Sequence, residues 1–117
     1  MSQHNGIGNK VGKLDKRRSQ IDRLDADIVR LLNHRARIAC ELGVIKVAAG
    51  LPAYDARREQ QVLARIRKHN RGPLDAESIT RIFRRVILET RRIGKWSMQQ
   101  ERTRYRQNSA KGYSNGN

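Results

Sequence analysis

The sequence predicts an all-α protein with three helices per chain, the first much longer than the other two. Apolar residues recur at steps of three and four along most of the chain, which is the spacing of one face of an α-helix. Turn signals around Pro52 and Pro73 divide this pattern into three parts. No alternation typical of a β-strand competes with it.

The first predicted helix covers residues 13–48, and neither Gly nor Pro interrupts it between Lys13 and Glu41. A straight helix of this length measures roughly 50 Å. The two shorter helices of so small a chain cannot cover that length. We therefore expect a second protein surface to cover its apolar positions, which are Leu14, Ile21, Leu24, Ile28, Leu31, Leu32, Ile38, Leu42 and Ile45.

The second predicted helix follows a break at residues 50–52. Pro52 lacks an N–H donor and disfavours helical backbone in the residue before it. Asp55 is expected to cap the N-terminus of this helix, because its side chain can accept a hydrogen bond from a free backbone N–H. The apolar positions that identify the helix are Val62, Leu63 and Ile66.

The third predicted helix follows the turn Asn70-Arg71-Gly72-Pro73 and is expected to be capped by Asp75. Gly94 is expected to end it, because glycine is favoured just past a helix C-terminus. Its apolar stripe consists of Ile79, Ile82, Phe83, Val86 and Ile87 and continues to Ile93.

The two ends of the chain lack this apolar periodicity. Residues 1–12 are polar and Gly-rich, and residues 95–117 are a basic mixture of Gln, Arg, Ser, Asn and Gly. Both segments are expected to be disordered tails beside one helical domain, residues 13–94. Neither end has the apolar centre of a signal peptide, and no apolar run approaches the roughly 20 residues of a membrane span. A cytoplasmic location and no membrane contact are expected.

The formal charge of +15 raises the possibility of a nucleic-acid partner. Between Lys13 and Gly94, however, 20 basic residues are mixed with 10 acidic ones, which accounts for +10 of the +15. A basic helical nucleic-acid-binding protein is therefore kept as an alternative, favoured by tail aromatics that can stack on bases. Against it, no zinc finger, RNA-recognition motif or helix-turn-helix break is visible. The tail aromatics are Trp96, Tyr105 and Tyr113.

Cysteine and histidine predict neither a disulfide nor a metal site. Cys40 is the only cysteine and lies within an apolar helical pattern, so it is expected to be a buried, unreactive thiol. The three histidines have no spacing typical of metal ligands. They are His4, His34 and His69.

Three basic residues lie on or beside the apolar face of the first helix. Arg35 and Lys46 are eleven residues apart, close to three whole turns, and Arg18 lies toward the same side. Each alone also fits a solvated basic helix. Arg18 and Arg35 are seventeen residues apart, roughly 25 Å of straight helix, so one small ligand cannot contact both within one chain. An antiparallel homodimer would bring them together and would also cover the apolar face.

Several short motifs, in this order and spacing, resemble the all-helical type of chorismate mutase over residues 13–94. The residues that carry the resemblance fall in six runs. They are Ile21-Asp22-Arg23-Leu24-Asp25, Leu31-Leu32-Asn33-His34-Arg35, Ala39-Cys40-Glu41-Leu42-Gly43-Val44-Ile45-Lys46, Tyr54-Asp55-Ala56-Arg57-Arg58-Glu59, Asn70-Arg71-Gly72-Pro73-Leu74-Asp75 and Ile82-Phe83-Arg84.

This resemblance implies an intertwined dimer of three-helix chains that converts chorismate to prephenate in aromatic amino-acid biosynthesis. The reaction is an intramolecular [3,3] rearrangement, so the family needs no cofactor, metal or nucleophile. Catalysis then comes from holding the substrate in its reactive conformation and stabilising the charge that develops on the ether oxygen.

The resemblance also implies roles for seven residues. Arg18 from the partner subunit and Arg35 would bind the carboxylates of the substrate, and Lys46 would contact the ether oxygen and a carboxylate. Asp55 and Glu59 would contact the ring-hydroxyl side of the substrate, and Arg58 would help to order the charged cluster. Thr90 would hydrogen-bond a carboxylate. The expected catalytic set is Arg35, Lys46 and Glu59.

Simpler roles remain open for these last four residues. Asp55 also fits a helix cap, Arg58 and Glu59 fit surface charges, and Thr90 fits an ordinary helix position. Gly94 departs from the family pattern, which usually places Gln or Glu four residues after Thr90. Losing one donor aimed at the transition state costs about a hundredfold in rate. A weak mutase, or a relative whose site serves another ligand, is therefore expected.

Two further questions stay open at the level of sequence. An isochorismate-pyruvate lyase shares this scaffold and a similar arrangement of basic groups, so it is the alternative enzyme. A partner enzyme of the shikimate pathway is also considered, because the basic tail could serve such an association.

Overall fold

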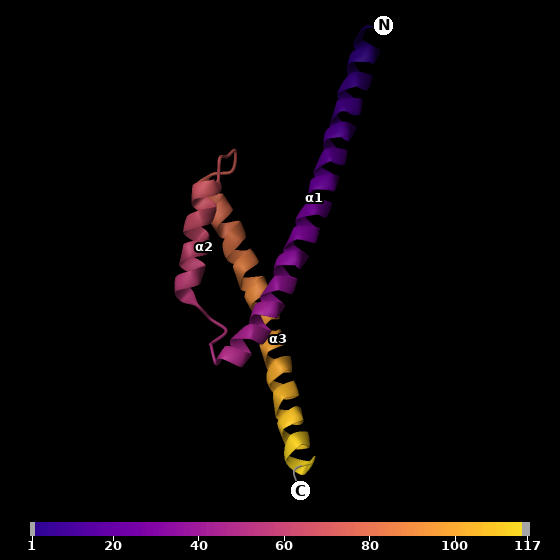
Figure 1. Cartoon of the computed structure of the whole chain (residues 1–117). Coiled ribbons are helices and arrows are strands. Elements are labelled where there is room, and N and C mark those ends of the chain that lie inside the picture. Colours follow the sequence, from indigo (N-terminus) through magenta and orange to yellow (C-terminus); the bar gives the residue numbers. More distant parts are fainter. Residues whose placement is uncertain (1, 116–117) are drawn as a thin grey trace. The chain divides into compact units, whose positions relative to one another are not determined.

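The computed structural model describes residues 2–115, which form three helices and no strand. They are α1 (Ser2–Ala49), α2 (Ala56–His69) and α3 (Ala76–Asn115) (Figure 1). The predicted all-α class is confirmed. Within the described residues, no helix is long and apolar enough to cross a membrane.

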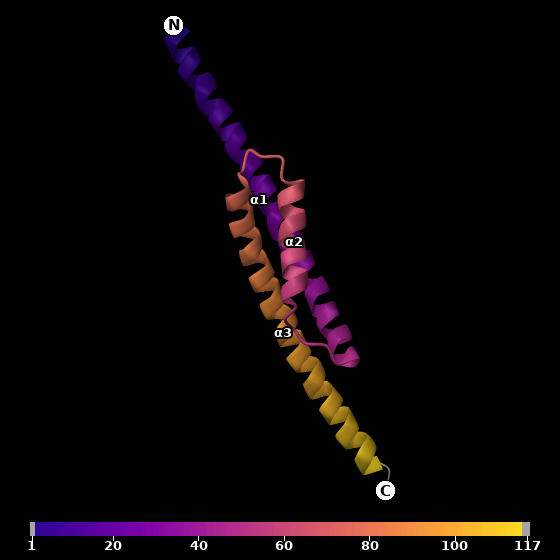
Figure 2. The ribbon, with the colours of Figure 1, turned by 90° about the vertical axis from the view of Figure 1, so that its left-hand side faces the viewer.

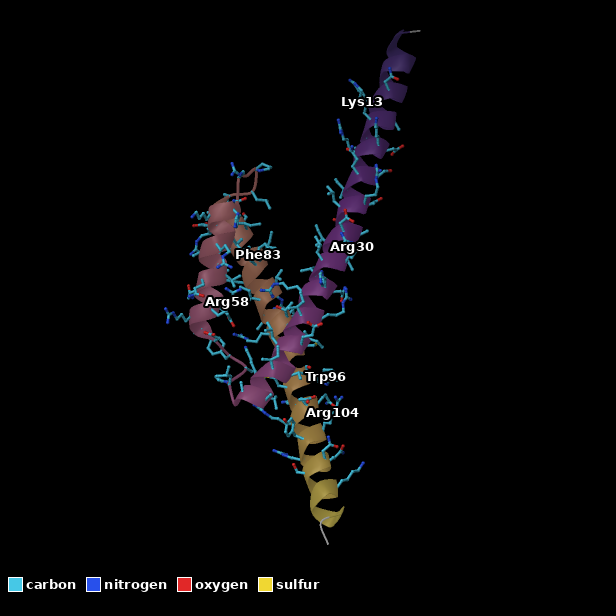
Figure 3. The ribbon with its side chains drawn as sticks, viewed as in Figure 1. Lys13, Arg30, Arg58, Phe83, Trp96 and Arg104 are labelled. Atoms are coloured by element: carbon cyan, nitrogen blue, oxygen red, sulfur yellow. The ribbon has the colours of Figure 1, made fainter. Side chains whose placement is uncertain are left out.

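The chain divides into two compact units, Met1–His34 and Arg35–Asn117. The first unit is a stretch of α1 whose apolar side chains are exposed; Leu24, for example, is 59% exposed. Side chains project from the helix on all sides, among them Lys13 and Arg30 (Figure 3). Among the described residues of this unit, nothing covers the apolar positions, which include Leu14, Ile21, Leu24, Ile28 and Leu31.

The second unit contains the last turns of α1 together with α2 and α3. The helices α2 and α3 lie side by side in both views of the ribbon (Figures 1 and 2). Leu63 of α2 and Ile87 of α3 are buried, as their positions in the predicted apolar stripes require. Met98, further along α3, is only 2% exposed.

Both predicted N-caps are confirmed. Asp55 accepts a hydrogen bond from the Arg58 backbone N–H (3.0 Å), and Asp75 accepts one from the Ser78 N–H (2.7 Å). Each bond pairs an N–H that has no partner within its own helix. The Ser78 N–H is also the main reason that the pKa of Asp75 lies below its ordinary value.

Gly50 ends α1. Its φ of +67° is in the left-handed region that glycine adopts without steric cost. The Leu51 N–H bonds to the Lys46 carbonyl (2.8 Å), and the Gly50 N–H bonds to the Val47 carbonyl (3.2 Å). This pair of bonds is a Schellman motif, and it fixes the backbone of Lys46 at the last turn of the helix.

The predicted helix ends are wrong at two places. α1 begins at Ser2, so residues 2–12 are helical, and α3 runs to Asn115, so residues 95–115 are helical instead of disordered. Neither segment contains proline, and extending an existing helix avoids the costly nucleation step. Met1, residues 116–117 and the side chains of His4 and Tyr113 lie outside the described part of the chain.

Gly94 does not end the third helix, and it lies where α1 crosses α3. A Cβ at Gly94 would lie 3.1 Å from the Ala39 carbonyl oxygen, and one at Gly43 would lie 2.8 Å from the Gly94 carbonyl oxygen. The two glycines therefore allow the backbones to approach closely. Glycine costs about 1 kcal/mol relative to alanine inside a helix, and this close packing offsets the cost.

Candidate functional site

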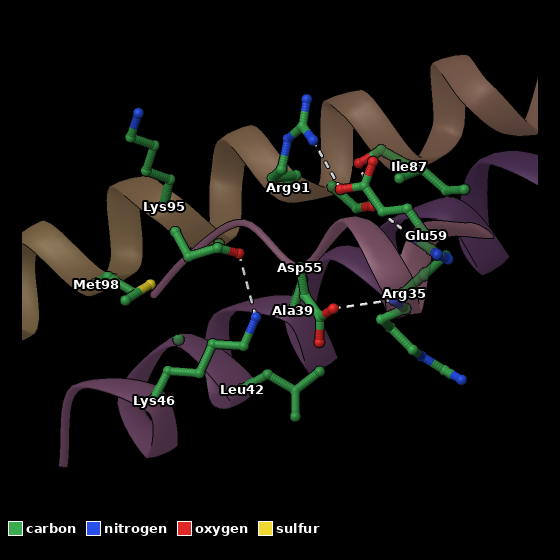
Figure 4. A pocket seen from close by; sticks show the side chains of 15 residues that line it. Arg35, Ala39, Leu42, Lys46, Asp55, Glu59, Ile87, Arg91, Lys95 and Met98 are labelled. Atoms are coloured by element: carbon green, nitrogen blue, oxygen red, sulfur yellow. Dashed lines mark hydrogen bonds and ion pairs between the residues drawn. The ribbon is translucent and has the colours of Figure 1, made fainter. Parts of the chain in front are cut away.

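A cavity of about 130 Å³ lies within the second unit (Figure 4). Its walls come from the last turns of α1, the connection to α2, the first turn of α2 and the middle of α3. The cavity is lined by the polar residues Arg35, Lys46, Asp55, Arg58, Glu59, Thr90, Arg91 and Lys95, together with Ala39, Leu42, Gly43, Ala53, Ile87, Gly94 and Met98.

Arg35 reaches across the cavity from α1 to α3. Its guanidinium donates a hydrogen bond to the Thr90 hydroxyl, and that hydroxyl donates to the Val86 carbonyl (2.8 Å). Partial burial lowers the pKa of Arg35 from its ordinary value, the charge of Arg58 lowers it further, and Glu59 raises it. An arginine stays protonated in proteins, so this side chain is a half-buried cation available to an anion.

Lys46 is held at the end of α1 by the Gly50 cap. Its ammonium Nζ donates to the Ala53 carbonyl oxygen (3.2 Å) in the connection to α2. An ammonium has three N–H donors, so this contact leaves two for a ligand. The bond also ties the connection to the helix that carries the lysine.

Asp55 has two roles in the structure, because it caps α2 and also lines the cavity. Its hydrogen bond to the Arg58 N–H starts the helical turn that carries Arg58 and Glu59 toward the cavity. The turn of α2 that Asp55 caps is therefore also part of the cavity wall.

Glu59 pairs with Arg91 of α3. Its Oε2 lies 2.7 Å from the Arg91 Nη1, and the two side chains are 25% and 31% exposed. The Arg91 guanidinium also lies over the Tyr54 ring, 4.7 Å from the ring centroid. This distance is within the range of a cation–π contact.

The cavity has a positive balance of charge. Five cations line it, against two carboxylates, Asp55 and Glu59. The cations are Arg35, Lys46, Arg58, Arg91 and Lys95. Such a wall favours a small ligand with two negative charges, since guanidinium groups bind carboxylates through paired hydrogen bonds. Among the described residues, no group of three or more His, Cys, Asp or Glu comes together as a metal site.

The structure brings together every expected site residue of the second unit. They are Arg35, Lys46, Asp55, Arg58, Glu59 and Thr90, and all six line the one cavity. Arg18 belongs to the first unit, and its side chain is exposed. Its role depends on a second chain and stays a prediction.

Sequence reasoning missed Arg91, Lys95 and Met98 as cavity residues. Met98 follows Thr90 and Gly94 at steps of four, so helical spacing could have placed it on the same face if the helix had been continued past Gly94. Arg91 follows Ile87 by four residues, so helical spacing places it on the side of α3 that carries the apolar stripe.

A family model described as chorismate mutase type II matches residues 17–95, about two thirds of the chain. The chain belongs to this family. The match includes every cavity residue except Met98. The family assignment made from the sequence motifs is therefore confirmed.

Similar proteins of known name agree with the family. A chorismate mutase structure (Form II) from Thermus thermophilus is 31% identical with a TM-score of 0.69, covering 71% of this chain and 94% of that one. A bifunctional chorismate mutase/prephenate dehydratase of Neisseria gonorrhoeae is 46% identical over 72 residues, or 62% of this chain. One of Aquifex aeolicus is 37% identical over 79 residues, or 64% of this chain. The chain spans only 19% and 22% of the length of these two bifunctional relatives.

Proposed function

We propose that this chain is a chorismate mutase, an isomerase that rearranges chorismate to prephenate in aromatic amino-acid biosynthesis. The observation that carries the proposal is the cavity itself. Its polar wall has the residues at the positions that the family resemblance assigns to substrate binding, and the family model matches the same segment. The substrate is a dianion, which fits the excess of cations over carboxylates.

In this proposal, Arg35 exchanges its Thr90 contact for a substrate carboxylate. The Lys46 ammonium, already oriented by the Ala53 carbonyl, donates its remaining N–H groups to the ether oxygen and a carboxylate. The Glu59 carboxylate accepts a hydrogen bond from the ring hydroxyl. The reaction breaks and forms bonds within one molecule, so the protein contributes orientation and charge stabilisation alone.

The test is the loss of the ultraviolet absorbance of chorismate after purified protein is added. We expect turnover by the wild type and a fall in kcat of about a hundredfold or more in Lys46→Ala, since one preorganised donor to the transition state is removed. Arg37→Ala is the matched control, because Arg37 is an exposed basic residue of α1 that does not line the cavity. Wild-type turnover no faster than buffer contradicts the proposal. Pyruvate release from isochorismate, measured in parallel, identifies the lyase alternative.

We further propose that the active form is a homodimer in which Arg18 enters the site of the partner. The exposed apolar positions of the first unit support it, since many exposed apolar side chains along one helix are typical of an interface. Sedimentation or light scattering should give twice the mass of the 13.5 kDa chain. A monomer that retains full turnover contradicts this part of the proposal.

A prephenate-consuming enzyme is the partner that we propose for the chain. The relatives named bifunctional chorismate mutase/prephenate dehydratase join both names in one polypeptide. Co-elution of this chain with a separately purified prephenate dehydratase tests the association, and independent elution at micromolar concentrations contradicts it. The cytoplasmic location stays a prediction from the sequence.

A further inference from the structure

Arg91 lies in the cavity wall, yet neither the sequence motifs nor the family resemblance assigns it a role. It comes from α3, and its guanidinium pairs with Glu59 of α2 at 2.7 Å. The same guanidinium lies over the ring of Tyr54, in the connection that leads into α2. Arg91 therefore links α3 both to α2 and to the connection that leads into α2.

The pairing uses only part of the Glu59 carboxylate. Arg91 binds Oε2, and a carboxylate has a second oxygen with its own acceptor sites. The Arg91 side chain is about two thirds buried and the Glu59 side chain about three quarters buried. Solvent therefore weakens this ion pair less than a fully exposed pair. A carboxylate fixed in this way can present its second oxygen to a ligand hydroxyl without first losing rotational freedom.

Without Arg91, the Glu59 carboxylate would have other cations to pair with. Arg35 and Arg58 line the same cavity, and the charge of Glu59 already acts on Arg35. An ion pair between Glu59 and Arg35 would occupy the guanidinium that the proposed mechanism reserves for a substrate carboxylate. The contact with the Tyr54 ring helps to hold the Arg91 guanidinium beside the Glu59 carboxylate.

We propose that Arg91 is a positioning residue, which holds Glu59 in place to accept the ring hydroxyl of the substrate and keeps it from neutralising Arg35. This inference rests on the proposed chorismate mutase function. Arg91 acts through Glu59, so its effect on the reaction depends on the presence of the Glu59 carboxylate.

A double-mutant cycle on kcat/KM tests this dependence. Arg91→Ala should lower kcat/KM about tenfold, because a misplaced catalytic group costs one to two orders of magnitude. In the Glu59→Gln background, the same change should cost no more than about threefold. Arg91→Lys should recover most of the activity, since an ammonium can also pair with the carboxylate. Losses that multiply in the double variant overturn the inference, because they are the result expected if Arg91 contacts substrate or only supports the fold.

Arg92→Ala is the matched control. Arg92 is the next residue of α3, is exposed and pairs with Glu89 instead of a cavity residue, so its loss should leave kcat/KM unchanged.

A second measurement separates this inference from the proposed function. If the wild type does not convert chorismate, the proposed function is wrong. Crystal structures of the wild type and of Arg91→Ala then still test whether Arg91 positions Glu59. A Glu59 carboxylate in the same place in both overturns it, and one moved toward Arg35 supports it.

Discussion

Complementation between two impaired variants tests whether each active site is built from two chains. Arg18→Ala and Arg35→Ala would each remove one of the proposed arginine–carboxylate contacts. A hydrogen bond to a charged group contributes about 1.5–3 kcal/mol, so each variant should lose about 10-fold to 150-fold in kcat/KM. Seventeen residues, or roughly 25 Å of helix rise, separate the two arginines, so in a homodimer the intact site must take one arginine from each chain.

Mixing the two variants under conditions of subunit exchange should restore activity. One site of each mixed dimer combines the intact Arg35 of one chain with the intact Arg18 of the other, and the second site lacks both. Random exchange makes half of the dimers mixed, so about a quarter of the wild-type activity is expected. The assay is chorismate consumption at fixed total protein, before and after exchange.

Two results refute this reasoning. If the mixture is no more active than the mean of its components, the two arginines do not serve one shared site. If Arg18→Ala is as active as the wild type, Arg18 does not bind the substrate. Arg17→Ala is the matched control for this variant, because Arg17 is the neighbouring residue of α1 and hydrogen-bonds Gln20 on the surface.

Three other substitutions test how the fold supports the site. Gly50→Ala should destabilise the fold by about 1–2 kcal/mol, because the φ of +67° is unfavourable for alanine. It should also raise KM, because the cap that holds the backbone of Lys46 would be loosened. Unchanged thermal unfolding and an unchanged KM contradict this prediction. Asp75→Asn should lower Tm at neutral pH. Folding lowers the pKa of Asp75, so the higher Tm of the wild type should be present above the ordinary pKa of 3.8. It should be lost as the pH falls through the lower pKa of the folded state. A difference in Tm that does not change with pH contradicts this prediction. Gly94→Gln should lower Tm without raising chorismate turnover, because its Cβ would crowd the Ala39 carbonyl, an overpacking that costs about 1–3 kcal/mol; a faster enzyme of unchanged Tm refutes this account.

The features that the sequence predicts well are those written into local spacing. Leu63 and Ile87 are buried because helical periodicity places them on apolar faces. Asp55 and Asp75 cap their helices because a short carboxylate next to a turn can reach the free N–H groups. Arg35 and Lys46 reach the same cavity because eleven residues are close to three turns of one helix.

The features that the sequence does not predict depend on contacts between distant segments. The pairing of Glu59 with Arg91 joins residues 32 positions apart on two helices, and no local pattern specifies which arginine meets the carboxylate. The extension of α3 past Gly94 was missed for a related reason. A glycine near the end of an apolar pattern usually marks a helix end. Only the crossing of α1 at Gly43 shows that Gly94 instead allows two helices to pack closely.

Gly94 connects the packing of the helices to the chemistry of the site. The family resemblance implies a Gln or Glu at this position, with a side chain that would hydrogen-bond the ether oxygen of the substrate. In this chain the position lacks a side chain, and the space beside it is taken by the backbone of α1 at Ala39. The close crossing and the absent donor therefore have one cause, and a donor cannot be restored there without moving the helices apart. In the proposed mechanism, charge stabilisation at the ether oxygen would then depend mainly on Lys46, whose position is fixed by the end of the same helix that approaches Gly94.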